Sequence, residues 1–386
     1  MMHVLIIPSW YPNTYNDLNG IFFQEQAEAL AKNNTKVGVI ALTQVTIQEI
    51  IKNKKLCFEN NEHTQNEVIT YQKDYFIFPK IHRKLAICRT RREYHFKKLF
   101  KEYIAKNGVP DIVHLHSFFY GHLAIWIKKE YNIPYVVTEH STTFARKLLS
   151  PSEIQYATKV YEQANKTLAV SKEFSILLKE KTNVSFEYLP NIVNVDFFKN
   201  IQEKSDSEKI RFITIGHLVP KKNQNMLIKA FILAFEKEKN VELLIVGEGP
   251  EYQNLEKSIH TLKAEKNIKL YGKASRKEVK ELLIGSDIFV LSSFYETFGV
   301  VLIEALSCGL PLVSTKSGGP ESIIINKKIG LLSETNEKEL AKAMKDVYTN
   351  LEKYNTEYLQ EYVEENFSEK AVTDQLLNIY KDITLR

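Results

Sequence analysis

Residues 292–324 read SSFYETFGVVLIEALSCGLPLVSTKSGGPESII. They follow four apolar residues, Ile288–Leu291, that predict a buried strand, and a second short apolar strand is expected at Leu312–Ser314. Between the two, a helix is expected to start around Thr297–Phe298. A strand, a helix and a strand joined by short connections form a βαβ unit, which builds a parallel sheet covered by helices. The stretch therefore predicts a doubly wound α/β fold.

The start of this expected helix is also a candidate binding site. Helix N-termini present free N–H groups and a partial positive charge, so they attract phosphate groups. Gly299 has no Cβ and lets a ligand approach the backbone closely. Glu296 and Glu304 flank this point, and their carboxylates can accept hydrogen bonds from hydroxyl groups on either side of a phosphate. A ribose on one side and a second sugar on the other suit this arrangement.

Short apolar runs alternate with helical patterns along most of the chain. Ile21–Lys32 has apolar residues at helical spacing, and Ser275 with Glu278 forms a capping box for a helix that runs to about Ile284. Further buried parallel strands are expected at Val4–Pro8, Val37–Leu42, Ile112–His116, Tyr135–Thr138, Arg211–Ile215, Leu243–Val246 and Ile268–Leu270.

A polar break divides this series. Ile201–Lys209 (IQEKSDSEK) contains almost nothing to bury and is expected to be a linker. We therefore expect an N-terminal Rossmann-like domain over residues 1–200 and a C-terminal one over 201–367. A terminal helix within 368–386 can pack back on the first domain. Since parallel sheets bind ligands at the carboxyl ends of their strands, two such domains facing a cleft can hold two ligands in apposition.

Composition excludes several classes of protein. With 386 residues, 44% of them hydrophobic, the chain can bury two cores, so disordered and collagen-like classes are excluded. Its three cysteines, Cys57, Cys88 and Cys308, lie far apart, which argues against a disulfide framework or a zinc knuckle and favours a reducing cytoplasm. The net charge of +5 is too small for a dedicated nucleic-acid-binding protein.

No stretch predicts a membrane span or a signal peptide. A span needs roughly 18–20 apolar residues, and the best candidate, Val300–Val313, is interrupted by Glu304 and by Gly309-Leu310-Pro311. The apolar run near the N-terminus ends at Pro8. We expect a cytoplasmic protein.

Residues 292–324 resemble the Glu-x7-Glu signature of the retaining glycosyltransferases of family 4, which have the GT-B architecture. The resemblance extends over the whole chain. The matching positions are Glu296-Thr297-Phe298-Gly299, Glu304-Ala305, Gly309, Pro311 and Gly318-Gly319, together with PSWYP (8–12), Asn19–Phe23 with Glu25-Gln26, Asp111–His116, Pro134–His140, Leu189-Pro190-Asn191, and Gly216, Leu218 and Lys222.

The resemblance assigns roles to these residues. It implies that Glu304 holds the nucleotide ribose, that Glu296 contacts the transferred sugar, and that His140 lies near the sugar and the acceptor. Lys222 corresponds to the lysine that neutralises the donor diphosphate, where a fixed cation stabilises the charge that grows on the leaving group. The main chain and side chains of the donor loops would complete the donor site: Gly20, His217, Thr297, Phe298 and Gly299.

Two positions depart from the family pattern. His217 stands where the family usually has arginine, and an imidazole is a weaker phosphate ligand than a guanidinium. The adjacent Lys221 can compensate, or His217 can be a loop histidine without a ligand. Many relatives have two glycines in the loop where this chain has only Asn19-Gly20.

Two other histidines suggest a metal pair at first sight. His114 and His116 share one face of a predicted strand, but no third ligand follows at suitable spacing, so buried structural histidines are expected. Enzymes of this family lack a catalytic metal, and the chain has no Asp-x-Asp element. We therefore expect no metal and no cofactor.

Residues 73–106 are basic, with eleven Lys or Arg against three acidic residues. Within 83–106, apolar residues recur at helical spacing: Phe96, Leu99, Phe100, Tyr103 and Ile104. Such a helix can lie on the anionic inner surface of a membrane, or its apolar stripe can pack on the protein's own sheet while the charges are solvated.

The resemblance implies a retaining transfer of a sugar from a nucleotide-diphosphate sugar, with a UDP-sugar expected rather than a GDP-sugar. The acceptor would be a glycan or an undecaprenyl-linked molecule in bacterial cell-surface polysaccharide or lipopolysaccharide synthesis. A nucleotide-sugar epimerase, an NAD-dependent oxidoreductase and a catalytically silent partner in glycan assembly are alternatives. For the oxidoreductase, Gly247-Glu248-Gly249-Pro250 lacks the third glycine of a dinucleotide fingerprint.

Overall fold

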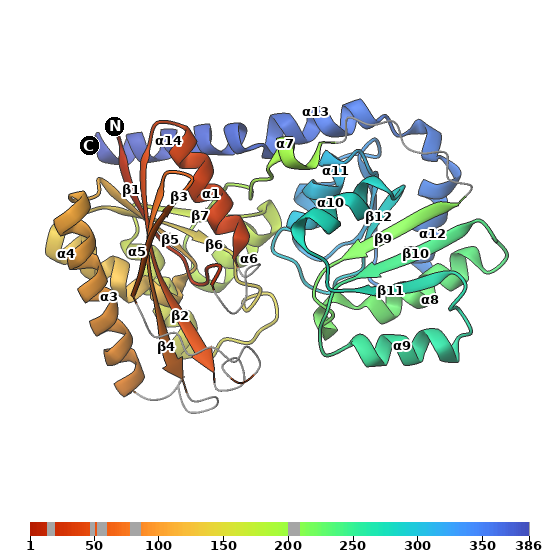
Figure 1. Ribbon diagram of the computed structural model, residues 1–386, viewed down its shortest axis with the longest axis horizontal. Coiled ribbons are helices and arrows are strands. Elements are labelled where there is room, and N and C mark those ends of the chain that lie inside the picture. Colours follow the sequence, from red (N-terminus) through yellow and green to blue (C-terminus); the bar gives the residue numbers. More distant parts are fainter. Residues whose placement is uncertain (14–19, 47–50, 52–59, 78–85, 200–208, 386) are drawn as a thin grey trace.

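The computed structural model describes residues 1–385 except 14–19, 47–50, 52–59, 78–85 and 200–208. It contains two mostly parallel sheets in two lobes (Figure 1), which confirms the predicted α/β fold. The predicted linker falls almost wholly on residues outside the described ranges, as does Cys57.

The first sheet has eight strands. Their order across the sheet is β3 (Asn60–Gln65), β4 (Val68–Ile77), β2 (Lys36–Thr46), β1 (His3–Ile7), β5 (Ile112–His116), β6 (Tyr135–Glu139), β7 (Lys166–Ala169) and β8 (Glu187–Tyr188). All neighbours pair in parallel except β3, which pairs with β4 in the antiparallel direction at one edge.

Both faces of this sheet are covered because side chains alternate along its strands. Leu5 and Ile7 of β1 belong to one buried cluster, with helices α3 (Ala86–Asn107), α4 (Gly121–Tyr131), α5 (Pro151–Gln163) and α6 (Lys172–Thr182). Val4 and Ile6 point to the other face, which packs against α1 (Ile21–Lys32) and α14 (Glu369–Thr384). A 3-10 turn, η1 (Phe118–Tyr120), precedes α4.

The second sheet has six parallel strands. Their order is β11 (Ile268–Gly272), β10 (Val241–Val246), β9 (Ile210–Ile215), β12 (Ile288–Leu291), β13 (Leu312–Thr315) and β14 (Gly330–Ser333). Its helices are α8 (Gln224–Phe235), α9 (Tyr252–Thr261), α10 (Arg276–Ile284), α11 (Val300–Ser307), α12 (Glu337–Thr349) and α13 (Thr356–Phe367), with 3-10 turns η2 (Pro220–Lys222), η3 (Pro320–Ser322) and η4 (Leu351–Lys353).

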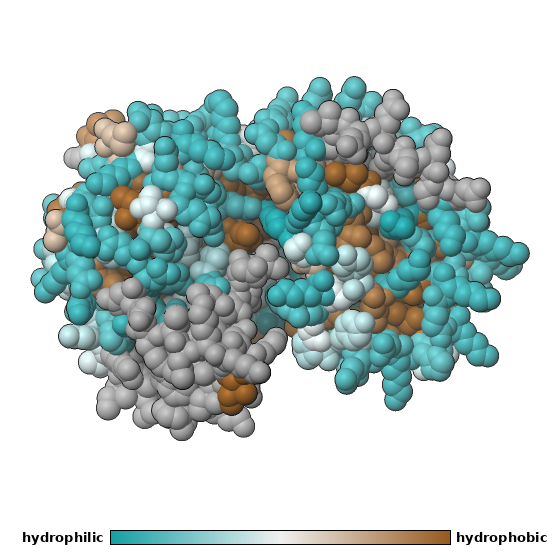
Figure 2. Space-filling view, in the orientation of Figure 1, coloured by the Kyte–Doolittle hydropathy of each residue, from teal (hydrophilic) through white to brown (hydrophobic). Residues whose placement is uncertain are grey.

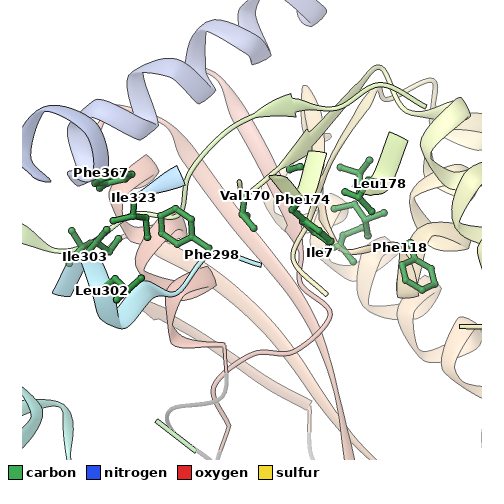
Figure 3. Close-up of a cluster of buried hydrophobic side chains, with 14 of the residues drawn as sticks. Ile7, Phe118, Val170, Phe174, Leu178, Phe298, Leu302, Ile303, Ile323 and Phe367 are labelled. Atoms are coloured by element: carbon green, nitrogen blue, oxygen red, sulfur yellow. The ribbon is translucent and has the colours of Figure 1, made fainter. Parts of the chain in front are cut away.

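The two lobes share one apolar core at their junction. One buried cluster includes Val170 and Phe174 of the first lobe together with Phe298 and Ile323 of the second (Figure 3). The short helix α7 (Val195–Phe198) also lies at this junction, where the Phe198 carbonyl accepts a hydrogen bond from Cys308. The lobes are therefore joined by packed side chains as well as by the chain itself.

The C-terminal helix returns to the first lobe. α13 and α14 run along one side of the molecule from the second lobe to the first, so that both chain ends lie together (Figure 1). Val372, Leu376 and Tyr380 of α14 are buried against the first sheet's α1 layer, and Lys32 pairs with Glu369 at 2.9 Å.

The apolar stripe of the basic helix α3 packs on the protein's own sheet. Phe96, Leu99, Phe100 and Tyr103 are at most 2% exposed, and Ile104 packs against the same core. Gly38 of β2 makes room for this packing, since a Cβ there would lie 2.0 Å from the Tyr103 hydroxyl oxygen. The second of the two interpretations of the stripe is therefore correct, and a membrane contact of α3 would depend on its charges. No helix in the described parts of the chain is long and apolar enough to span a bilayer.

Candidate active site

A hollow lies between the two lobes (Figure 2). Loops from both sheets meet there. The Thr297 hydroxyl donates to the His140 carbonyl at 2.9 Å, and the Ser171 hydroxyl donates to the Gly318 carbonyl at 2.9 Å. The first bond holds the loop after β12 against the loop after β6, and the second holds the loop after β13 against the loop after β7. Together they place the candidate residues of both lobes at one cleft.

Lys222 and Glu296 form a buried ion pair in the second lobe. Lys222 Nζ lies 2.5 Å from Glu296 Oε1, and the Ser293 hydroxyl donates to the same oxygen at 2.7 Å. The two loops are also joined by their backbones, because the Phe294 N–H donates to the Lys221 carbonyl. Burial alone would raise the pKa of Glu296, but Lys222, Lys221 and Ser293 more than offset this effect and lower it. The carboxylate is therefore ionised and fixed in place.

His217 lies apart from this pair. Its ring is exposed, and its Nδ1 lies 3.3 Å from the Glu248 carbonyl oxygen. Lys221 is closer to the centre of the site, and burial lowers its pKa while Glu296 opposes this change. The structure thus places the predicted substitute cation, Lys221, beside Lys222 and Glu296.

The helix after β12 begins later than expected. α11 starts at Val300 with Gly299 as its N-cap, whose φ of 100° ends any regular helix at that point. Thr297 instead bonds across the cleft to His140, and Phe298 is 1% exposed in the shared core. The prediction of a helix from Thr297–Phe298 was wrong, because Thr297 is held by its hydrogen bond to His140 and Phe298 by its packing in the shared core.

Glu304 lies on the first turns of α11 and is 4% exposed. Arg276, the first residue of α10, donates from Nη1 to Glu304 Oε1 at 2.5 Å. The same guanidinium donates from Nη2 to Glu25 on α1 of the first lobe. Sequence analysis missed Arg276. The capping box of Ser275 and Glu278, which the structure confirms, was a usable signal because it placed Arg276 at the start of a helix.

His140 belongs to a buried histidine cluster. Its Nε2 lies 3.0 Å from His116 Nδ1, and the two remaining ring nitrogens, His140 Nδ1 and His116 Nε2, have no hydrogen-bond partner among the described residues. Burial, and after it His114, lowers the pKa of His140 to about 3, so the ring is neutral at pH 7. The His140 ring therefore keeps one buried nitrogen whose hydrogen-bonding capacity no described residue satisfies.

The remaining polar residues around His140 are structural. His114 is 0% exposed and bonds Tyr380 at 2.6 Å and Thr138 at 2.7 Å, as expected of a core histidine. Within the described ranges, no three His, Cys, Asp or Glu side chains gather as a metal site needs. Glu139 accepts bonds from the Tyr161 hydroxyl and from nearby backbone N–H groups, so it shapes the loop that carries His140.

Gly20 caps α1 in a left-handed conformation, with φ 77°. A Cβ there would lie 2.6 Å from the Trp10 carbonyl oxygen, so only glycine fits at this close approach of two loops. The preceding residue, Asn19, is outside the described ranges.

Two family models match the chain. One, "Glycosyltransferase Family 4", covers residues 20–197, and the other, "Glycosyl transferases group 1", covers residues 196–364. The chain belongs to the family 4 glycosyltransferases.

Curated relatives agree with this family. The chain is 26% identical over 244 residues to the GPI3 subunit of phosphatidylinositol N-acetylglucosaminyltransferase from Saccharomyces cerevisiae (strain YJM789), covering 60% of this chain and 54% of that protein. It therefore spans about half the length of this relative. A probable sucrose-phosphate synthase from Thermosipho melanesiensis is 28% identical over 396 residues, covering 94% of this chain and 90% of that one.

Solved structures show the same GT-B fold. Sucrose-phosphate synthase from Thermosynechococcus elongatus superimposes with a TM-score of 0.79 at 18% identity over 100% of both chains. The Anabaena protein HepE, in complex with UDP and glucose, does so with a TM-score of 0.72 at 16% identity, over 99% of this chain and 100% of that one.

Proposed function

We propose that this glycosyltransferase moves a hexosyl or N-acetylhexosaminyl group from a nucleotide-diphosphate sugar to a glycan or lipid-linked acceptor, with retention of configuration. The buried pair of Lys222 and Glu296 is the main support, because a cation held 2.5 Å from a carboxylate in the cleft is ready to meet a diphosphate beside a sugar. The setting we propose is bacterial cell-surface glycan synthesis.

In this proposal each candidate residue has a role. Lys222, with Lys221 beside it, neutralises the diphosphate, and Glu304 accepts hydrogen bonds from the nucleotide ribose. Glu296 and His140 contact the transferred sugar from opposite lobes. The backbone at Gly20, Thr297, Phe298 and Gly299 lines the donor, while His217 lies at the edge of the site.

The proposed reaction needs no protein nucleophile. The acceptor oxygen bonds to the anomeric carbon as the bond from that carbon to the phosphate oxygen breaks, and the acceptor proton passes to the departing phosphate. Lys222 stabilises the charge on that phosphate. We propose that no metal is required, and activity that survives EDTA treatment of the enzyme would support this point.

The names of the relatives support the donor and acceptor classes. One acts as an N-acetylglucosaminyltransferase on phosphatidylinositol by name, and a structural neighbour binds UDP and glucose. A UDP-sugar is therefore the first donor to test. Neither named relative is an epimerase or a silent assembly partner, so we do not pursue these alternatives.

The acceptor side can include a membrane surface. Lys101 of α3 is exposed. Lys98 and Lys106 are 57% and 60% exposed and form ion pairs with Glu102 and Glu62, which anionic lipid headgroups could replace. Flotation with anionic and neutral liposomes tests this part of the proposal. Equal binding to both, or none, removes it.

Saturation-transfer NMR with UDP-, GDP- and ADP-sugars tests the function itself. We expect the protein to bind a UDP-sugar and expect Glu304→Gln to weaken that binding, while Glu352→Gln on the surface turn η4 leaves it unchanged. The anomeric coupling constant of the product then reports retention. Failure of every donor to bind the native protein, or an inverted product, contradicts the proposal.

A further inference from the structure

One arginine lies between carboxylates of the two lobes. The Arg276 guanidinium donates to Glu304 Oε1 on its own lobe at 2.5 Å and to Glu25 Oε1 on the opposite lobe. A guanidinium can serve two carboxylates at once because its N–H groups form a rigid planar fork. The position of one carboxylate therefore depends on the other.

Several contacts fix this guanidinium. Its carbon Cζ lies 4.8 Å from the centre of the buried Phe198 ring and 5.9 Å from that of Phe197. The Ser275–Glu278 capping box fixes the first turn of α10, from which the side chain extends. Burial works against the charge of Arg276, but Glu304 and Glu25 more than offset it and raise its pKa. The result is a permanent, oriented cation that is only 24% exposed.

Glu304 and Glu25 each have one carboxylate oxygen that does not bond Arg276. Among the described residues, no donor contacts Glu304 Oε2, and Glu25 Oε2 is buried without any hydrogen-bond partner. Two carboxylates around one cation also leave an excess of negative charge. Burial raises the pKa of Glu25 to about 7, although Arg276 opposes the change. Above that pKa, at pH 8, Glu25 is ionised, and the group can accept further hydrogen bonds from a ligand rich in hydroxyl groups.

The three residues connect two parts of the proposed donor site. Glu25 lies on α1, the helix that Gly20 caps, and Glu304 is the proposed ribose ligand. Opening of the cleft would separate Glu25 from Arg276, since they lie on different lobes. The bond between them can form only while the lobes are in contact.

We propose that Arg276 is a positioning residue of the donor site, which orients Glu304 toward the nucleotide ribose and joins it across the cleft to Glu25. Ribose binding and contact between the lobes then strengthen each other, because both favour the same position of Glu304. This inference rests on the proposed function, in which Glu304 binds the ribose.

The test measures binding of UDP, with GDP and ADP in parallel, by titration calorimetry at pH 8. The variants are Arg276→Gln, Arg276→Lys, Glu25→Gln, Glu304→Gln and the double variant Arg276→Gln/Glu304→Gln. Lys277→Gln is the matched control, since Lys277 follows Arg276 in the same helical turn and is 84% exposed. Each protein is also titrated with 2′,3′-dideoxy-UDP, which lacks the hydroxyl groups that Glu304 is proposed to bind.

We expect Arg276→Gln to weaken UDP binding about tenfold and Glu25→Gln about threefold, as for loss of charged hydrogen bonds. Arg276→Lys should lie between native protein and Arg276→Gln. The double variant should bind no more weakly than Glu304→Gln alone, because both changes remove the same contact. With dideoxy-UDP, Arg276→Gln and the native protein should bind equally well, an outcome that a purely structural role of Arg276 does not produce.

Two results overturn the inference. One is an Arg276→Gln protein that binds UDP as Lys277→Gln does; the other is an equal loss of affinity for UDP and dideoxy-UDP. If Arg276→Gln does not fold, the comparison of Arg276→Lys with native protein on the two nucleotides decides in the same way. If Glu304→Gln binds UDP as the native protein does, or if no nucleotide binds the native protein, the ribose assignment of the proposed function fails, and the inference falls with it.

Discussion

Removal of Lys222 should affect activity and stability to different extents. The Lys222 ammonium lies 2.5 Å from Glu296, and the two side chains are only 16% and 9% exposed. Lys222→Ala leaves a buried carboxylate without its cation, which costs about 3–5 kcal/mol in typical cases. Since Lys221 stays close to Glu296, we expect a loss of free energy of unfolding near the lower end, about 3 kcal/mol.

Lys222→Ala should lower activity by more than its loss of folding stability can explain. Removal of one fixed group that stabilises developing negative charge costs about 10²–10³-fold in kcat. His217→Ala, which removes an exposed ring with a single long contact to Glu248, should cost less than about tenfold, the size of a weak surface contact. Urea unfolding measures the stability of each variant, and initial rates at saturating donor measure kcat.

A double variant separates the two effects. Lys222→Met/Glu296→Gln removes both charges and keeps the volumes similar, so stability should return to within about 1 kcal/mol of native, while activity stays low. If His217→Ala loses more activity than Lys222→Ala, or if the double variant regains turnover, the role assigned to Lys222 is wrong.

Three further changes test the structure elsewhere. Folding raises the pKa of Glu25 from 4.5 to about 7. Its contribution to the free energy of unfolding, about 3 kcal/mol, is therefore present below pH 4.5 and is lost as the pH rises through 7. Glu25→Gln should remove this part of the pH dependence of urea unfolding. Gly319→Ala would bring a Cβ to 2.5 Å from the Phe298 backbone nitrogen, and it should lower stability by about 1–3 kcal/mol. Tyr380→Phe removes the partner of the buried His114 ring at 2.6 Å, and it should cost about 1–3 kcal/mol and speed hydrogen exchange in α14.

Matched controls exist for these variants. Gly285→Ala adds the same methyl group where the nearest atom is 3.4 Å away, and Tyr94→Phe removes a hydroxyl from a residue that is 64% exposed. Both should be close to native in stability. A Gly319→Ala or Tyr380→Phe protein as stable as its control contradicts the packing described above, and an unchanged pH profile for Glu25→Gln contradicts the shifted pKa.

Much of the fold could be predicted because local patterns agree with it. Ile21–Lys32 forms a helix with the bounds expected, and the Ser275–Glu278 capping box starts α10. The edge strand β3 was missed because its sequence, NNEHTQ, has no apolar alternation. A strand at the exposed edge of a sheet can form without alternating apolar residues.

The candidate site was predictable only in part. Motif residues such as Glu296 and Lys222 lie together because adjacent loops of one sheet carry them. The bond from Arg276 to Glu25 joins positions 251 residues apart on separate lobes, and no local pattern encodes such a distance. Likewise, the late start of α11 follows from the bond of Thr297 to His140, which depends on how the lobes meet.

The return of α14 to the first lobe has a consequence for synthesis on the ribosome. Val372, Leu376 and Tyr380 complete a core whose last strand, β8, ends at Tyr188. Roughly 180 residues separate the two, and at about 5–20 residues per second their synthesis takes on the order of 10–40 seconds. During that interval α1 and one face of the first sheet lack their covering helix. The second lobe can therefore finish folding before the first lobe, although its sequence is synthesised later. Until α14 packs, the apolar face of the first lobe that α14 covers stays exposed, and a chaperone can bind it.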